Sequence, residues 1–177
     1  DFQKVSEFKK VKYSCMAPAS VWFTKQWSSH KWVELINLIP AEQNVYLLGA
    51  PSDYNLCEEI KSQISNLKSQ ICFNLAGKLS FLESAALMKD ATMNYVNDSA
   101  PLHLASAVNA PATAVFCSTV PGFGFTPLSD KSFIAQTTEN LSCRPCGLHG
   151  KSSCPEKHFK CAESIKAEDV FSLSLNN

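Results

Sequence analysis

The 177-residue sequence has no long uninterrupted apolar run. Its most apolar segment, residues 104–125, is broken by Asn109, Pro111, Pro121 and two glycines. A membrane-spanning helix needs about 20 consecutive, mostly apolar residues. The sequence therefore predicts no transmembrane segment.

An excess of one charge is also missing. Lys and Arg number 16, Asp and Glu number 16, and the formal net charge is +0. The charges are scattered, and there is no acidic or polybasic tail. Nucleic-acid binding needs a basic face, so we expect no nucleic-acid partner.

Two common nucleotide-binding motifs are absent. The sequence contains neither G-x-G-x-x-G nor a Walker lysine loop, which disfavours NAD, FAD and ATP hydrolysis. Residues 1–12, DFQKVSEFKKVK, lack the central apolar run of a signal peptide. We therefore expect a reducing, cytoplasmic setting. Because the sequence does not begin with Met, we treat it as a piece of a longer protein.

The sequence does contain alternating strand and helix patterns. Strand patterns lie at 12–19, 44–50, 71–77, 92–97 and 112–118, and helix patterns at 29–39, 53–64, 80–91, 99–108 and 165–175. Residues 119–133 form a turn-rich loop. This alternation predicts right-handed βαβ units in one parallel sheet, and hence a doubly wound α/β domain over residues 1–177. In such sheets, ligands bind at the carboxyl ends of the strands.

One strand-to-helix corner, NYVNDSAPLHLASAV at residues 94–108, combines an acid, a hydroxyl and an imidazole. Asp98 or Ser99 can cap the helix, and Pro101 suits its first turn. The helix amides and His103 would then form an anion site. Alternatively, this is an ordinary helix start with a structural histidine.

Lys25 follows the first predicted strand, in the loop APASVWFTKQW. A lysine at that edge suits a phosphate pair, although most lysines are simply solvated. Asp98 is the one carboxylate at the corner, and a magnesium site usually needs more oxygen ligands. We therefore expect Lys25, Ser99 and His103 to line one metal-free pocket, with Asp98 at its rim.

These segments together resemble a known family. The likeness is carried by APASVWFTKQW, LLGAPSD, the stretch from NLAGKLS to APATAVF, and FTPLS. It covers roughly residue 13 to the end, and its most specific part is the Asp98-Ser99-Ala100-x-x-His103 pattern. The sequence resembles the C-terminal domain of ADP-heptose:lipopolysaccharide heptosyltransferases, which are glycosyltransferases of the GT-B fold. The resemblance implies a Rossmann-like sheet and a nucleotide-sugar partner.

The resemblance also implies roles for individual residues. Lys25 and His103 would stabilise the leaving diphosphate and are the implied catalytic residues. Asp53 would approach the ribose, Leu79 the adenine, and Asp98 the sugar. The implied donor-binding set is Ser20, Thr24, Lys25, Asp53, Leu79, Asp98, Ser99, Ala100 and His103.

The implied reaction is an inverting, metal-independent transfer of heptose from ADP-heptose to an inner-core sugar hydroxyl of lipopolysaccharide. The acceptor and the general base would belong to an N-terminal domain absent from this chain, so the chain alone would be inactive. The full protein would be cytoplasmic and peripheral to the inner membrane. At Ala19 and Ala100 the family usually has Gly. These departures keep two alternatives open: a non-catalytic nucleotide- or sugar-binding domain, and a GT-B enzyme using another nucleotide sugar.

The segment 143–161, CRPCGLHGKSSCPEKHFKC, is rich in cysteine. Cys143, Cys146, Cys154 and Cys161 include a C-x₂-C pair, which can take part in a tetrahedral zinc site. His149 and His158 lie in the same segment. The alternatives are a reduced surface loop or two disulfides. No cofactor is required for the implied reaction, so a zinc ion here would be structural.

Overall fold

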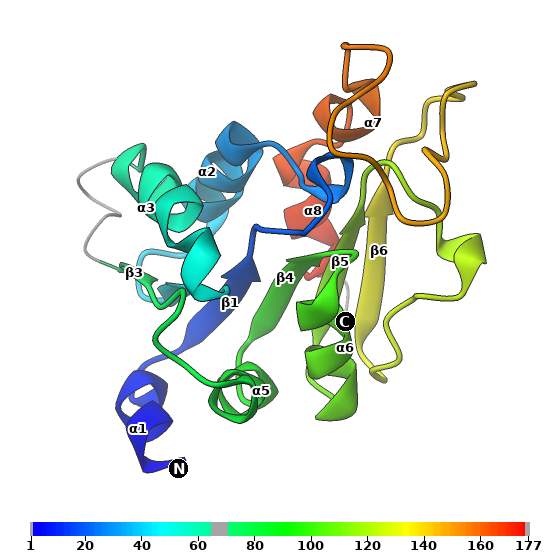
Figure 1. Ribbon diagram of the computed structural model, residues 1–177. Coiled ribbons are helices and arrows are strands. Elements are labelled where there is room, and N and C mark those ends of the chain that lie inside the picture. The colour runs from blue at the N-terminus through cyan, green and yellow to red at the C-terminus, as the bar shows by residue number, and fades with distance from the viewer. Residues whose placement is uncertain (1, 65–70, 176–177) are drawn as a thin grey trace.

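The computed structural model describes residues 2–64 and 71–175 and contains a six-stranded sheet (Figure 1). The strands are β1 (Tyr13–Ala17), β2 (Asn44–Leu47), β3 (Cys72–Asn74), β4 (Met93–Asn97), β5 (Ala112–Phe116) and β6 (Ser132–Gln136). Their order is β3-β2-β1-β4-β5-β6, and every neighbouring pair is parallel. The predicted doubly wound α/β fold is confirmed.

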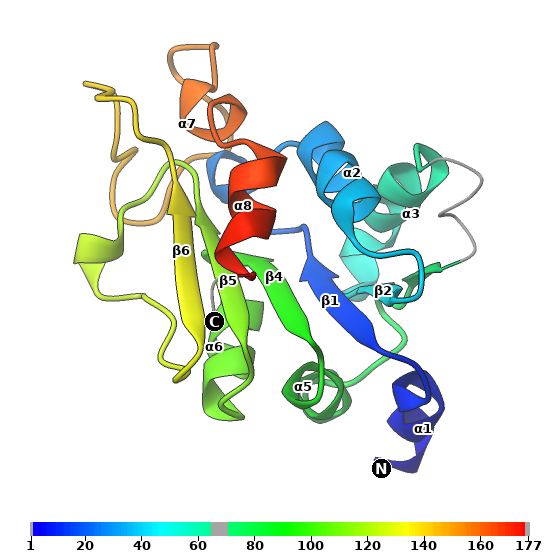
Figure 2. The ribbon, with the colours of Figure 1, turned by 180° about the vertical axis from the view of Figure 1, so that it is seen from behind.

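Helices cover both faces of the sheet (Figures 1 and 2). The helices are α1 (Gln3–Ser6), α2 (Ser29–Leu38), α3 (Tyr54–Ser62), α5 (Phe81–Lys89), α6 (Ala100–Ala107), α7 (Lys160–Glu163) and α8 (Ala167–Leu173). One hydrophobic cluster joins α2, α3 and α8 to the sheet, and a second joins α1, α5 and α6 to its other face. The two-sided covering explains why the central strands are buried along their whole length.

Successive side chains of a strand point to opposite faces of the sheet, so each strand contributes to both hydrophobic clusters. In β1, Met16 belongs to the cluster under α2, whereas Cys15 and Ala17 belong to the cluster under α5 and α6. Trp27 and Trp32 pack edge to face with ring centroids 5.2 Å apart, and both are almost fully buried. Both belong to the hydrophobic cluster that contains α2, α3 and α8.

Strand β6 was not predicted. Its residues lie in and just beyond the segment 119–133, which we interpreted as a loop, and the strand is only partly buried. An edge strand packs fewer apolar side chains and so leaves a weaker pattern in the sequence.

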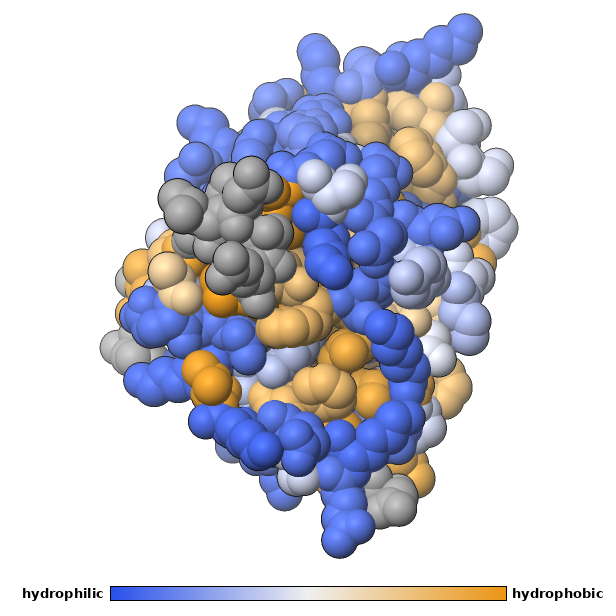
Figure 3. Space-filling model, turned by 90° about the vertical axis from the view of Figure 1, so that its left-hand side faces the viewer, coloured by the Kyte–Doolittle hydropathy of each residue, from blue (hydrophilic) through white to orange (hydrophobic). Residues whose placement is uncertain are grey.

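The opposite edge of the sheet is formed by β3. Figure 3 views the molecule from this side and shows hydrophobic residues gathered on it, with hydrophilic residues around them. Phe73 of β3 is 40% exposed. Among the described residues, no helix combines the length and apolar character needed to cross a bilayer.

The strand order indicates where along the carboxyl ends of the strands a ligand can bind. β1 lies between β2 and β4, so the chain runs outward in opposite directions from the β1–β4 pair. The loops that leave the carboxyl ends of two such strands diverge and form a crevice. Here these are the loop after Ala17 and the corner after Asn97.

Candidate functional site

A buried ion pair lies at this edge of the sheet. Lys25 Nζ lies 2.8 Å from Asp98 Oδ2, and the two side chains are 14% and 5% exposed. The Thr119 hydroxyl donates to the same oxygen at 2.7 Å. Lys25 and Asp98 therefore meet at one edge, as their positions after β1 and β4 predicted. Asp98 is buried, however, so its predicted place at the rim of a pocket was wrong.

The loop that carries Lys25 is fixed by a buried amide. Asn97 Nδ2 donates to the Pro18 carbonyl at 2.7 Å, and Trp27 N–H donates to Asn97 Oδ1 at 3.0 Å. Asn97 thus holds both ends of the loop beside β4. Neither Asn97 nor Thr119 was predicted from the sequence as a site residue. An asparagine at the end of a buried strand was the available signal for Asn97.

The N-terminus of α6 lies at the same edge, directly after Asp98. Ser99 occupies its N-cap position, yet no side chain caps the helix in the described structure. The Ser99 hydroxyl lies 3.5 Å from the Ala19 carbonyl, and Asp98 is committed to Lys25. The expected cap by Asp98 or Ser99 is therefore not formed. Without a side-chain cap, the first amides of this helix keep their capacity to bind an anion.

The remaining predicted residues lie on α6 or on loops that follow the strands. His103 is exposed on α6, with its ring centroid 6.5 Å from that of Phe125. Asp53, after β2, accepts from the Ala50 N–H at 2.8 Å. Leu79, after β3, is partly buried against the cluster under α5. Ser20 is half-buried in the loop after β1.

Two positions where the resembled family usually has glycine are occupied by alanine without strain. Neither Ala19 nor Ala100 has a positive φ, which is the conformation that favours glycine. Ala100 is exposed at the start of α6. The backbone therefore accepts a Cβ at both places, and the departures do not distort the loop or the helix.

The cysteine-rich segment lies at the same edge because it follows β6. Arg144 donates to the carbonyls of Cys117 at 2.8 Å, Phe116 at 3.2 Å and Thr119 at 2.7 Å. Cys146 N–H donates to the Ser118 carbonyl at 2.8 Å. These bonds fasten the segment to the chain that leaves β5, next to the Lys25–Asp98 pair.

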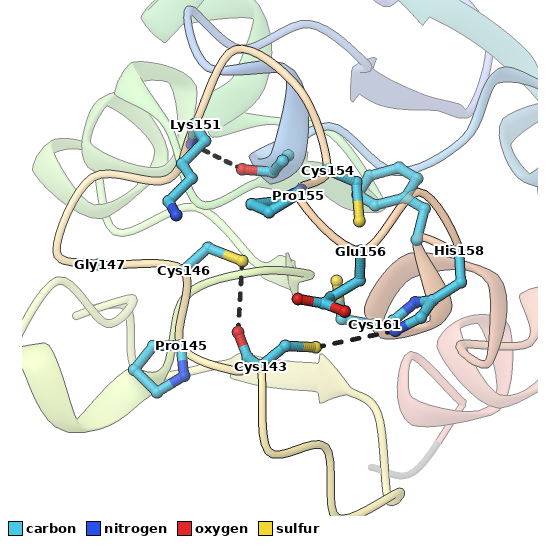
Figure 4. A pocket seen from close by; sticks show the side chains of 12 residues that line it. Cys143, Pro145, Cys146, Gly147, Lys151, Cys154, Pro155, Glu156, His158 and Cys161 are labelled. Atoms are coloured by element: carbon cyan, nitrogen blue, oxygen red, sulfur yellow. Dashed lines mark hydrogen bonds between the residues drawn. The ribbon is translucent and has the colours of Figure 1, made fainter.

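Four thiols of this segment line one cavity of about 190 Å³ (Figure 4). They are Cys143, Cys146, Cys154 and Cys161, and none of them forms a disulfide. Within residues 2–64 and 71–175, no three ligating side chains are placed to hold a metal ion. The predicted convergence of the four sulfurs on one point is thus not observed, although their gathering in one cavity is.

Two thiols of the cluster, Cys161 and Cys146, have raised pKa values and so favour their protonated form. Burial raises the pKa of Cys161 to about 11, and the neighbouring thiols add to the effect. Burial also raises the pKa of Cys146, and the neighbouring thiols Cys143 and Cys154 raise it further. Binding of a metal here would have to displace these protons.

Comparison with known proteins identifies the family. The model of glycosyltransferase family 9 (heptosyltransferase) matches residues 1–158. The chain belongs to glycosyltransferase family 9. Among its curated relatives, lipooligosaccharide heptosyltransferase 2 of Haemophilus influenzae is 34% identical over 116 residues, which are 65% of this chain and 33% of the relative.

Solved structures carry the same fold as this family 9 chain. The E. coli ADP-heptose lps heptosyltransferase II superposes with a TM-score of 0.74 at 22% identity, over 98% of this chain and 50% of that one. The iron-containing dodecameric glycosyltransferase TibC of enterotoxigenic E. coli gives 0.67 at 19% identity, over 92% of this chain and 45% of that one. The family 9 chain thus spans between a third and a half of the length of these proteins.

Proposed function

We propose that residues 1–177 are the donor-binding half of a glycosyltransferase that moves heptose from ADP-heptose to an inner-core sugar hydroxyl of lipopolysaccharide. The observation that supports this most is the placement of Lys25 beside the uncapped N-terminus of α6, at the point where the strand order reverses. A cation and a row of backbone amides at one sheet edge are what a diphosphate requires.

The proposed chemistry depends on the leaving group. Breaking the bond between the sugar and the diphosphate builds negative charge on the phosphate oxygens. The Lys25 ammonium has three donors, so it can keep its bond to Asp98 and still donate to a phosphate. His103 would add a donor from α6. Groups fixed in this way before the reaction stabilise the transition state without a cost of reorganisation.

The sugar and nucleoside would occupy the flanking loops. Both described contacts of Asp98 use Oδ2, so its other oxygen would accept from a sugar hydroxyl. Asp53 would approach the ribose and Leu79 the adenine. Ser20, Ser99 and Ala100 complete the proposed donor set. Thr24 belongs to it only indirectly, because its hydroxyl is engaged by other protein groups.

The acceptor and the general base are proposed to lie in another part of the whole protein. The curated relatives are up to about three times as long as the matched part of this chain. The reaction would invert the anomeric configuration and need no metal at the phosphates. We place it in the cytoplasm, at the inner membrane where the acceptor lipid would be presented.

A transfer assay with the whole protein tests this proposal. ADP-heptose and a heptose-deficient lipopolysaccharide acceptor should give ADP and a product of inverted configuration in Mg²⁺-free buffer. Lys25→Ala should lower kcat by roughly 10²-fold or more, as loss of a leaving-group donor does. Turnover of UDP- or GDP-sugars but not ADP-heptose would favour another GT-B transferase. Donor binding without any turnover would favour a non-catalytic binding domain.

A further inference from the structure

The loop that carries Lys25 is joined to the cysteine-rich segment by a reciprocal pair of hydrogen bonds. Thr24 N–H donates to the Lys151 carbonyl at 3.1 Å, and Lys151 N–H donates to Thr24 Oγ1 at 2.7 Å, the bond drawn at Lys151 in Figure 4. The Ser118 hydroxyl donates to the same Thr24 oxygen at 3.0 Å. Thr24 is only 1% exposed, so its hydroxyl is part of the protein interior.

Gly150 brings the backbone of that segment against the Lys25 side chain. Its φ is +80°, and a Cβ built on it would lie 3.0 Å from both Lys25 Cγ and Thr24 Oγ1. Contacts that short are tighter than real Cβ atoms normally make, so the lysine stem or the threonine would have to move. Glycine is therefore needed here both for its conformation and for the space it leaves.

We propose that the turn Gly150-Lys151 is a positioning element for Lys25, which couples the cysteine-rich segment to the donor phosphates. The turn packs on the lysine stem from one side, while Asp98 and Thr119 fix the ammonium group from the other. Any rearrangement of residues 143–161 is then transmitted to the phosphate site through Thr24. This inference rests on the proposed donor function of Lys25.

Gly147 offers a matched control. It lies in the same segment and also has a positive φ, +71°, but a Cβ there would have no neighbour within 4 Å. Gly147→Ala and Gly150→Ala therefore impose similar backbone strain, and only Gly150→Ala presses on Lys25 and Thr24. Calorimetric titration of the purified chain with ADP, and separately with adenosine, compares the two.

We expect Gly150→Ala to weaken ADP binding roughly tenfold, which is the loss of one charge-assisted hydrogen bond. Gly147→Ala should stay within about twofold of the unmodified chain. Adenosine lacks phosphates, so its affinity should be the same in both variants. In the whole protein the effect should fall on donor KM and kcat together. Equal ADP affinity in the two variants would overturn the positioning role while leaving the donor function intact.

A second pair of variants covers the case in which Gly150→Ala does not fold. Thr24→Val removes the acceptor for the Lys151 N–H, and Thr24→Ser keeps it. ADP affinity should fall in Thr24→Val and be restored in Thr24→Ser. No difference between the two would contradict the proposal. If the unmodified chain does not bind ADP at all, the donor function fails, and the positioning role fails with it.

Discussion

Lys25 is a charged side chain that is mostly buried and is held in place by an ion pair. An amine this enclosed needs a partner, because an unpaired buried charge is strongly destabilising. Asp98 supplies it, with Thr119 as a second donor to the carboxylate. Both Lys25 and Asp98 could be singled out from the sequence by their positions after strands. Their mutual pairing could not, because it depends on side-chain directions that the pattern of residues does not encode.

Removing Asp98 should therefore destabilise the fold. Asp98→Ala leaves the Lys25 ammonium buried without its counterion, and we expect the free energy of unfolding to fall by about 3 kcal/mol. Urea denaturation followed by circular dichroism measures this. Glu7→Gln is the control, because the Glu7–Lys10 pair is 72% and 68% exposed and should change stability by less than about 0.5 kcal/mol. Equal stability of both variants would show that the buried pair is not structurally important.

At the scale of elements, the cysteine-rich segment differs from the rest of the chain. The β1, β2, β4 and β5 strands and their helices follow hydrophobic periodicity, and the sequence predicted them nearly at their observed bounds. Residues 143–159 contain no helix or strand and are held instead by specific bonds. Arg144 is the main anchor, with three backbone carbonyls as acceptors. Nothing in the local sequence marks that arginine, because the three carbonyls that it binds lie 25 to 28 residues away.

Arg144→Ala should release this segment before it affects the sheet. Loss of the guanidinium leaves the three carbonyls without this donor, at a cost of about 2 kcal/mol. Limited proteolysis should then cut within residues 143–161 at least several-fold faster, while the protease-resistant core remains. Lys131→Ala, at the opposite end of β6, serves as the control for loss of a positive charge. Unchanged cleavage in Arg144→Ala would mean that other contacts hold the segment.

At the scale of the whole molecule, helices cover both faces of the sheet, and the resulting core buries several cysteine thiols. Parallel pairing and the gathering of strand ends at one edge follow from βαβ connectivity, so both could be predicted from the sequence. The strand order could not be predicted and comes from the structure. The thiols Cys57 and Cys72 illustrate what burial adds. It raises the pKa of each to about 12, and burial raises the pKa values of Cys15 and Cys117 as well.

These raised pKa values predict loss of stability in alkali. The pKa of a cysteine in the unfolded chain is roughly 8.5. In the folded chain the pKa is raised to about 11 for Cys161 and to about 12 for Cys57 and Cys72. The unfolded state binds fewer protons in this window, so stability is complete below about pH 8.5 and falls as the pH rises. Each buried thiol contributes up to about 1.4 kcal/mol per pH unit. Urea midpoints in a reducing buffer should drop between pH 7.5 and 9.5, and drop less for Cys57→Ala. A flat profile would contradict thiol burial.

The central claim is that this sheet edge holds a diphosphate through Lys25 and the N-terminus of α6, and ADP binding to the chain tests it most directly. At saturating ADP we expect a rise in melting temperature of a few degrees, since 100 times the dissociation constant stabilises by about 2.7 kcal/mol and each kcal/mol is worth roughly 2–4 °C. The shift should be the same with and without Mg²⁺, much smaller with adenosine, and reduced in Lys25→Ala and His103→Ala. No shift at several millimolar ADP, or a shift that requires Mg²⁺, would contradict the account.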